Sequence, residues 1–349
     1  MATNKPIRAA VLGASGYTGA DMIRLAALHP EIKITALIAK GHAGQSLAQV
    51  FPHLASLDLP KLVTSDEIDW EEVDITFCGL PHGTAHGEIA KLPERIKIID
   101  MSADFRLRDP ATYAEWYGGE HSAPALLKGA VYGLTEYYRD KINAARLVAC
   151  PGCYPTAVLL ALLPLIKSQL IALEDIIVDA KSGVSGAGRS LKQNILFSEV
   201  GEGLSPYGIG NHRHVPEIEQ ELSLASGAGV TINFTPHLVP MSRGELCTNY
   251  VRLAGKATAA DLRKALAKAY AKCPFVHVVE EGVIPATQHV RGSNFCHIGV
   301  FPNRIEGRAI VVSAIDNLVK GSAGQALQNF NLMFGFDETT ALKQLPLFP

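Results

Sequence analysis

The sequence predicts an α/β protein with two domains. The first is a Rossmann-type domain with a parallel sheet, and the second is an α+β domain with a mixed or antiparallel sheet. At 349 residues the chain is longer than one hydrophobic core usually grows to. Strand-like and helix-like segments alternate in its first half, as in folds with parallel sheets. In the second half, strand-like segments follow one another with few helices between them.

The first strand is expected at residues 7–12, followed by a glycine-rich loop and a helix to about Leu28. Such a loop is a variant of the dinucleotide-binding fingerprint, whose glycines let the backbone approach a pyrophosphate at the helix N-terminus. An ordinary strand-to-helix turn is the alternative. The loop residues expected to bind the cofactor are Gly13, Ser15, Gly16, Tyr17, Thr18 and Gly19.

The second strand, at residues 32–38, ends in Ala39-Lys40 rather than in an acidic residue. An acid at this place accepts hydrogen bonds from the ribose of NAD, whereas a cation suits the 2′-phosphate of NADP. We therefore expect NADP(H) as the cofactor and Lys40 as a candidate phosphate ligand, although an exposed lysine after a strand is common.

Two more strands are expected at residues 74–78 and 96–100. Gly79 and Pro81 follow the first of them, at the carboxyl edge where open α/β sheets bind ligands, and are expected near the cofactor. Arg106 follows the second and is a candidate substrate ligand, because guanidinium groups bind phosphate or carboxylate in a bidentate way. A surface salt bridge is the competing explanation.

The most informative stretch is residues 149–156, between a short strand and a long apolar helix. Cys150 closes the strand, whereas Cys153 begins the helix. Unpaired N–H groups and the helix dipole stabilise an anion there, so a thiolate is favoured at Cys153. The spacing of the two cysteines is also that of a thiol–disulfide oxidoreductase, in which both would be required.

After a strand at residues 176–180, the segment 181–189 reads as a glycine-rich loop, either a ligand contact or a flexible connection. Its candidate cofactor ligands are Ser182, Gly183 and Gly186.

The strands of the second domain are expected at residues 230–234, 246–251, 275–279, 294–301 and 309–314. One helix, from about Thr258 to Lys272, interrupts them. The sheet that they form could present a face for dimerisation.

His212-Arg213-His214 precede a helix. One imidazole can exchange protons near neutral pH while the arginine holds an oxyanion, or a histidine could only cap the loop. No third ligand lies at a nearby spacing, so no metal is expected. With Arg106, the candidate substrate ligands are His212, Arg213 and Arg243.

The last helix is expected from Asp316 to about Phe334 and to return to the first domain, with Asn317 and Lys320 near the cofactor. The expected domains are thus residues 1–152 with 317–349 for NADP binding, and 153–316 for catalysis and dimerisation.

The bulk properties narrow the partners and the compartment. A net charge of −2 gives no global reason to expect nucleic acid or an acidic membrane. The longest apolar run, at residues 157–163, is far shorter than the roughly 20 residues that span a bilayer. The N-terminus leads into a strand without the apolar core of a signal peptide, and a disulfide framework is not expected in so long a chain. A cytoplasmic protein is expected.

Along essentially the whole chain, these motifs resemble the N-acetyl-gamma-glutamyl-phosphate reductases of arginine biosynthesis. The resemblance implies an NADP-dependent reductase that forms a homodimer or homotetramer, with Cys153 as nucleophile and His214 as acid/base. It rests on residues 13–19, 102–106, 151–156, 212–217 and 320–326.

The chemistry of such a reaction agrees with these residues. Reduction of an acyl phosphate to an aldehyde calls for a nucleophile that displaces phosphate and leaves a reducible thioester, and cysteine does this. Other substrates with the same chemistry are aspartyl phosphate, as in aspartate-semialdehyde dehydrogenase, and a carrier-bound aminoadipyl phosphate. A non-catalytic NADP-sensing protein would share the glycine loop but would not need a thiolate.

Overall fold

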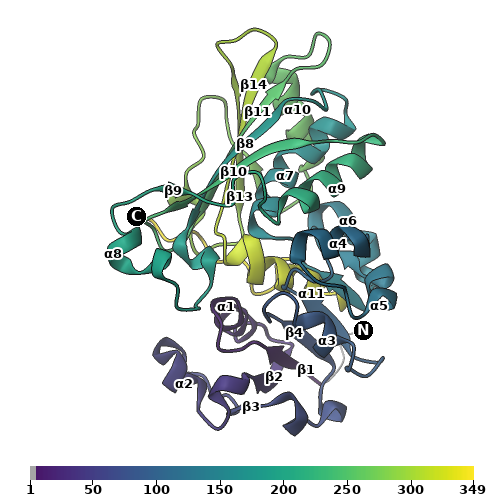
Figure 1. Ribbon diagram of the computed structural model, residues 1–349, viewed down its shortest axis with the longest axis vertical. Helices are drawn as coiled ribbons and strands as arrows, with labels where there is room; N and C mark the ends of the chain where they lie inside the picture. Colours follow the sequence, from purple (N-terminus) through teal and green to yellow (C-terminus); the bar gives the residue numbers. More distant parts are fainter. Residues whose placement is uncertain (1–4) are drawn as a thin grey trace. The chain divides into compact units, whose positions relative to one another are not determined.

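The structure is a computed structural model that describes residues 5–349. The chain forms two compact units (Figure 1). The first unit runs to Pro151 and includes Ser322–Lys343, and the second consists of Gly152–Gly321 and Gln344–Pro349.

The first unit contains a seven-stranded sheet of order β3-β2-β1-β4-β5-β7-β6, in which every pair of neighbours is parallel. Its central strands are buried on both faces and are therefore nearly continuous apolar runs, as parallel sheets require. The strands are β1 (Ile7–Leu12), β2 (Ile32–Ile38), β3 (Leu62–Val63), β4 (Ile75–Cys78), β5 (Lys97–Asp100), β6 (Val131–Tyr132) and β7 (Leu147–Ala149).

The last helix, α11 (Gly324–Met333), belongs to the first unit, where it contacts α1, α6 and β5. Asn331 hydrogen-bonds to His29 at 2.9 Å, and Thr135 donates to Asn329 at 2.6 Å. The predicted return of this helix to the first domain is confirmed. The other helices of this unit are α1 (Tyr17–Ala26), α2 (Leu47–Val50), α3 (Ala85–Ile89), α4 (Pro110–Tyr117), α5 (Pro124–Gly129) and α6 (Thr135–Ala144).

The second unit contains a mixed sheet of order β12-β13-β14-β11-β8-β10-β9. The pairs β12·β13 and β8·β10 are parallel and the other pairs are antiparallel, as the bunched strand-like segments predict. Its strands are β8 (Ile176–Gly183), β9 (Ser205–Pro206), β10 (Ile232–Val239), β11 (Glu245–Arg252), β12 (Val276–Val278), β13 (Cys296–Pro302) and β14 (Arg308–Ile315).

Three helices of this unit, α7 (Cys153–Lys167), α9 (Val215–Ser226) and α10 (Ala259–Ala269), lie on one side of the sheet (Figure 1). From Tyr154 to Ile166 every residue of α7 is buried, so this helix forms the core of the unit. A fourth helix, α8 (Phe197–Val200), is a single turn in the connection between β8 and β9. Within residues 5–349 no helix combines the length and the apolar character that crossing a membrane requires.

Two segments differ from the sequence-based expectation. Strand β8 continues through Lys181-Ser182-Gly183, which were expected in a loop, because all three pair with β10 and the first two also pair with β11. Residues 109–143, whose sequence shows little periodicity, contain three helices and a short strand. Helix α4 begins there because the Asp109 side chain accepts hydrogen bonds from the N–H groups of Ala111 and Thr112.

Candidate active site

The glycine-rich loop lies between β1 and α1, where the order of strands in the first sheet reverses between β1 and β4. A Cβ on Gly13 would lie 2.6 Å from the Gly79 carbonyl oxygen, and one on Gly19 would lie 2.4 Å from the Gly13 carbonyl oxygen. Gly13 also has a φ of 80°, which favours glycine. These glycines hold the loop close to its neighbours, and Gly16 caps α1 without a side chain, so the residues fit a pyrophosphate at this helix start.

The other predicted cofactor ligands of the first unit belong to the same edge of the sheet. Lys40 is exposed just after β2, and the Gly79 N–H donates to the Leu12 carbonyl at 2.8 Å. Tyr17 and Pro81 are also exposed. Because the strands are parallel, the carboxyl ends of β2, β1 and β4 share one edge, which is where such sheets bind ligands.

Two of the predicted cofactor ligands of the second unit, Gly183 and Asn317, are linked by hydrogen bonds through Gly244. Asn317 donates to the Ser185 hydroxyl at 2.9 Å and accepts from the Gly244 N–H at 2.8 Å. The Gly183 N–H donates to the Gly244 carbonyl at 2.9 Å. Ser182 is buried and Gly186 is exposed. Lys320 is completely buried, with its ammonium group 6.0 Å from the centroid of the Phe275 ring.

The two cysteines of the central stretch differ in environment. Cys153 is the first residue of α7 and is partly exposed, and Gly152 caps the helix without a side-chain hydrogen bond. Cys150 is completely buried, and Asn329 donates a hydrogen bond to its sulfur at 3.6 Å. Burial raises the pKa of the Cys150 thiol to about 12. Neither cysteine forms a disulfide bond, and Cys153 is the one in a setting that suits a nucleophile.

The His214 ring lies against the residue that precedes Cys153. A Cβ on Gly152 would lie 2.4 Å from Nε2 of His214, so only glycine leaves room for the imidazole. His214 also caps α9, which follows it. The structure thus brings two predicted catalytic residues together within the second unit.

His212 contacts His214 through a hydrogen bond and through its ring. Its Nδ1 accepts a hydrogen bond from the His214 N–H at 3.2 Å, and the two ring centroids are 4.8 Å apart. Burial, with a smaller contribution from Arg213, lowers the pKa of His212 to about 4. His212 is therefore neutral at neutral pH, which leaves its nitrogen free to accept this hydrogen bond.

Glu217 is a residue of the site that the sequence analysis missed. Its carboxylate is completely buried and accepts a hydrogen bond from the Gly152 N–H at 2.9 Å. It thereby fixes the backbone immediately before Cys153. Tyr154, which follows Cys153, is also buried, and its hydroxyl accepts a hydrogen bond from Tyr207 at 3.2 Å.

The three candidate arginines have different environments. Arg106 is buried in the first unit and donates to the carbonyl oxygens of Cys150 at 2.8 Å and Met101 at 3.1 Å. Arg213 is exposed, and Arg243 lies 3.5 Å from the carboxylate of Asp316. The Arg106 contacts support the end of β7, and binding of substrate by any of the three stays a prediction.

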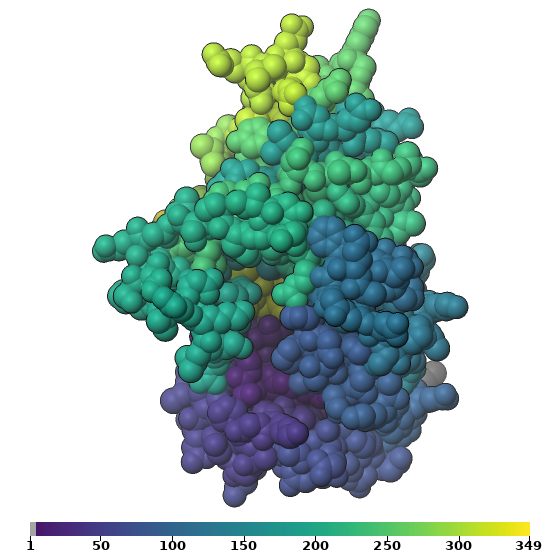
Figure 2. Space-filling view, viewed as in Figure 1, coloured from purple at the N-terminus to yellow at the C-terminus, as the bar shows by residue number. Residues whose placement is uncertain are grey.

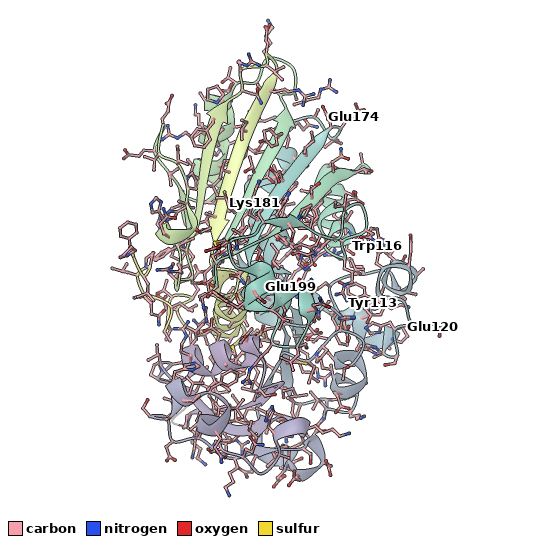
Figure 3. All side chains as sticks on the ribbon, turned by 60° about the vertical axis from the view of Figure 1, so that its left-hand side comes forward. Tyr113, Trp116, Glu120, Glu174, Lys181 and Glu199 are labelled. Carbon is pink, nitrogen blue, oxygen red and sulfur yellow. The ribbon has the colours of Figure 1, made fainter. Side chains whose placement is uncertain are left out.

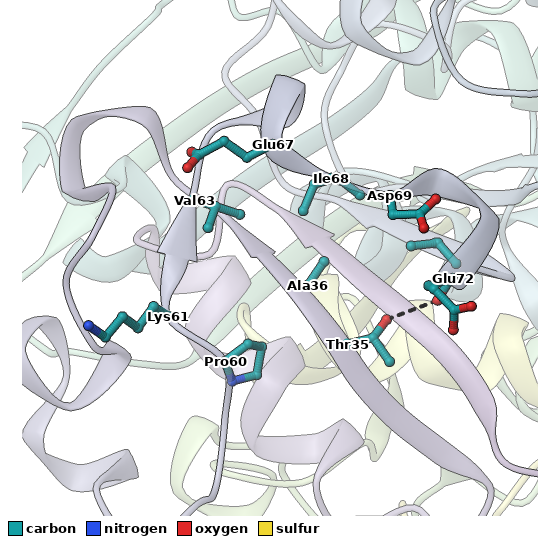
Figure 4. A pocket seen from close by; sticks show the side chains of 10 residues that line it. Thr35, Ala36, Pro60, Lys61, Val63, Glu67, Ile68, Asp69 and Glu72 are labelled. Atoms are coloured by element: carbon teal, nitrogen blue, oxygen red, sulfur yellow. Dashed lines mark hydrogen bonds between the residues drawn. The ribbon is translucent and has the colours of Figure 1, made fainter.

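A surface depression in the first unit contains none of the predicted site residues. Thr35 and Ala36 of β2 form one wall, and the Thr35 hydroxyl donates to the Glu72 carbonyl at 3.3 Å (Figure 4). The described residues contain no group of three or more His, Cys, Asp or Glu side chains arranged to hold a metal ion.

Two family models match the chain. The model of the semialdehyde dehydrogenase NAD binding domain matches residues 8–145, and that of the semialdehyde dehydrogenase dimerisation domain matches residues 153–317. In fold, the chain is similar to aspartate semialdehyde dehydrogenase II from Vibrio cholerae, with a TM-score of 0.72 and 16% identity over 95% of this chain and 99% of that one.

Close relatives cover the chain from end to end. The N-acetyl-gamma-glutamyl-phosphate reductase of Rhodospirillum rubrum is 55% identical over 98% of this chain and 99% of its own length. That of Paracoccus denitrificans is 55% identical over 98% and 99%. A chloroplastic relative from Arabidopsis thaliana is 56% identical over 99% of this chain and 86% of its own length. The chain therefore belongs to the N-acetyl-gamma-glutamyl-phosphate reductase family.

Proposed function

We propose that this protein reduces N-acetyl-gamma-glutamyl phosphate to N-acetylglutamate semialdehyde with NADPH and releases phosphate. The observation that carries the proposal is the position of Cys153 at the start of α7, with the His214 ring against the preceding residue. An acyl phosphate is the kind of substrate that a cysteine nucleophile converts into a reducible thioester.

In the proposed cycle, the Cys153 thiolate attacks the acyl carbon and expels phosphate, which leaves a thioester on the sulfur. NADPH supplies the hydride that reduces the thioester carbon. His214, as the imidazolium, donates a proton to the oxygen that becomes negative in this step. The resulting hemithioacetal loses the proton of its hydroxyl to His214 and collapses to the aldehyde and the thiolate. N–H groups at the start of α7 stabilise the negative oxygen.

The reverse reaction tests the proposed substrate. With N-acetylglutamate semialdehyde, NADP should be reduced at a rate that requires phosphate, and aspartate semialdehyde should react at least about a hundredfold more slowly. Comparable rates with the two aldehydes would contradict the assignment. A reaction that occurs only with a carrier-bound aminoadipyl semialdehyde would point to the related reductase instead.

Cofactor preference is predicted from Lys40. NADPH should be used at a KM at least about tenfold below that for NADH, because Lys40 can pair with the 2′-phosphate. Lys40→Ala should raise the KM for NADPH and leave that for NADH unchanged. Lys33→Ala removes another exposed lysine, on β2, and serves as the control. Turnover with NADH that equals or exceeds turnover with NADPH would contradict the prediction.

We infer that the protein is a homodimer or homotetramer that associates through the open face of the second sheet. On the side of the sheet opposite α7, strands β8, β11 and β14 present partly exposed side chains, among them Lys181, Tyr250 and Ile310; Figure 3 marks Lys181 on β8. The region lies within the match to the dimerisation domain. Light scattering of the wild type and of Tyr250→Asp tests this, and a monomeric wild type would contradict it.

The connection between β8 and β9, which contains α8, protrudes from the surface (Figure 2). Its side chains Leu191 and Phe197 are 97% and 89% exposed and would be covered in an oligomer. We propose that residues 1–152 with 317–349 form the NADP-binding domain and residues 153–316 the catalytic domain, which also carries the candidate cofactor ligands Ser182, Gly183 and Gly186. We also propose a cytoplasmic location; the relative from Arabidopsis thaliana is chloroplastic.

A further inference from the structure

Glu245 is a buried acid that the proposed cycle does not use. It is the first residue of β11 and pairs with Ser182 of β8 and Ile315 of β14, inside the sheet of the second unit. Its side chain is completely buried. Apart from the Cys153 thiol, no hydrogen-bond partner within the described residues reaches either carboxyl oxygen. A buried carboxyl left so nearly unpaired is unusual and calls for an explanation.

Asp316 provides a contrast close by. It is also completely buried, but it accepts hydrogen bonds from the N–H groups of Gly292, Leu318 and Val319 at 2.7 to 3.0 Å, and Arg243 lies 3.5 Å away. These donors stabilise a carboxylate. Glu245 has no such donors, and the nearby Asp316 raises the pKa of its carboxyl group.

The two acids therefore differ in their surroundings, and those of Glu245 favour its neutral form. Burial, together with Asp316, raises the pKa of Glu245 to about 8, and the Cys153 side chain acts in the opposite direction. Glu245 is thus mainly protonated at neutral pH, and a carboxylic acid has an O–H to donate. The burial that raises the pKa values of Tyr154, Tyr207 and Cys247 keeps these neighbours neutral as well. The titratable groups that face Glu245 are Cys153, Tyr154, Tyr207, Cys247 and Asp316.

We propose that Glu245, in its protonated form, donates a hydrogen bond to the Cys153 thiolate and so positions the nucleophile. The carboxyl proton stays on Glu245 throughout, so no atom is transferred. A hydrogen bond to a charged group is stronger than one between neutral groups, and the buried setting strengthens it further. Glu245 is accordingly a positioning residue, and it acts from within the sheet while His214 acts from the start of α9.

The proposal rests on the proposed function, because it takes Cys153 as the nucleophile. Its test does not need the substrate: the rate at which iodoacetamide alkylates Cys153 is measured against pH. Cys273 is the other described cysteine that is partly exposed, so its reaction is subtracted with a Cys153→Ala protein. If the wild-type protein alkylates as predicted but does not reduce the acyl phosphate, the result counts against the proposed function and leaves the contact between Glu245 and Cys153 supported.

Glu245→Gln keeps the shape of the side chain and a weaker donor, whereas Glu245→Leu removes the donor. Alkylation at pH 7 should fall a few-fold in the first variant and at least about tenfold in the second, with the pH midpoint displaced upward in that order. Glu219→Gln is the matched control, since Glu219 is a partly buried acid of α9 whose pKa burial also raises, and it should alkylate at the wild-type rate.

Two results would overturn the proposal. Faster alkylation in Glu245→Gln would show that the native acid is ionised and repels the thiolate. A wild-type profile in Glu245→Leu would show that the acid does not affect the sulfur. Where a variant fails to fold, infrared spectroscopy of the wild-type protein before and after alkylation of Cys153 tests the contact. Alkylation should shift the C=O band of the protonated Glu245 carboxyl, and an unchanged spectrum would contradict the contact.

Discussion

Cys153→Ser is expected to abolish reduction of the acyl phosphate, by at least roughly a thousandfold in kcat, with binding of NADPH retained. A serine hydroxyl stays protonated at neutral pH and cannot form a thioester. The helix start that favours a thiolate at this position gives an alcohol far less help. The measurement is the steady-state oxidation of NADPH together with cofactor binding followed by fluorescence.

Cys150→Ser is the matched control for this prediction. Cys150 is buried with its sulfur in a hydrogen bond from Asn329, which a serine oxygen can also accept, so most activity should remain. Appreciable turnover in the Cys153 variant would refute the covalent step. An equal loss in both variants would favour a thiol–disulfide mechanism, in which the two cysteines act as a pair.

His214→Asn is expected to lower kcat by about a hundredfold to ten-thousandfold, because the negative oxygen loses its proton donor. The pH–rate profile should also lose the limb that reports the imidazole. His212 cannot replace it, since its pKa is lowered to about 4 by burial and by Arg213. A profile unchanged by the substitution would argue against His214 as the acid/base.

Gly152→Ala tests whether the His214 ring must occupy its observed position. The new methyl group would meet Nε2 of His214 at 2.4 Å, so the ring must move, although the φ of −62° at Gly152 suits alanine. Activity should fall sharply in this variant, whereas Gly229→Ala, which has open space around it, should behave as wild type. The double variant with His214→Asn should be little worse than His214→Asn alone, and additive losses would contradict a shared cause.

The parts of the site that could be predicted are those whose chemistry is local in sequence. Cys153 follows a strand and a Pro-Gly turn and begins an apolar helix, and the structure has a helix from this residue. The glycine loop is likewise a strand, a turn and a helix start in direct succession. In both places the residue types and the backbone geometry are determined by neighbours a few positions away.

The parts that were missed depend on contacts between distant residues. Glu217 reaches Gly152 across 65 positions of sequence, and Glu245 reaches Cys153 only because β11 is central in the second sheet. A signal for the first was present: Glu217 and Glu221 are buried on α9 beside Ile218 and Leu222. An acid within an apolar helical stripe indicates a buried partner.

The limits of strand β8 show the same dependence. Ser182 and Gly183 have low strand propensity, and the sequence therefore favours a loop. Pairing with β10 on one side and β11 on the other overrides that preference. The glycine-rich loop, which was expected to begin at residue 181, therefore begins at Val184 and is shorter than expected.

The central claim, a thioester on Cys153, can be tested directly with the aldehyde and NADP in the absence of phosphate. The thiol adds to the aldehyde, and loss of hydride to NADP leaves the acyl group on the sulfur with nothing to remove it rapidly. We predict a burst of NADPH equal to the amount of enzyme and an N-acetylglutamyl adduct on the peptide that contains Cys153, which phosphate then releases. Absence of the adduct in an enzyme that turns over normally with phosphate, or an adduct on another residue, would contradict the mechanism.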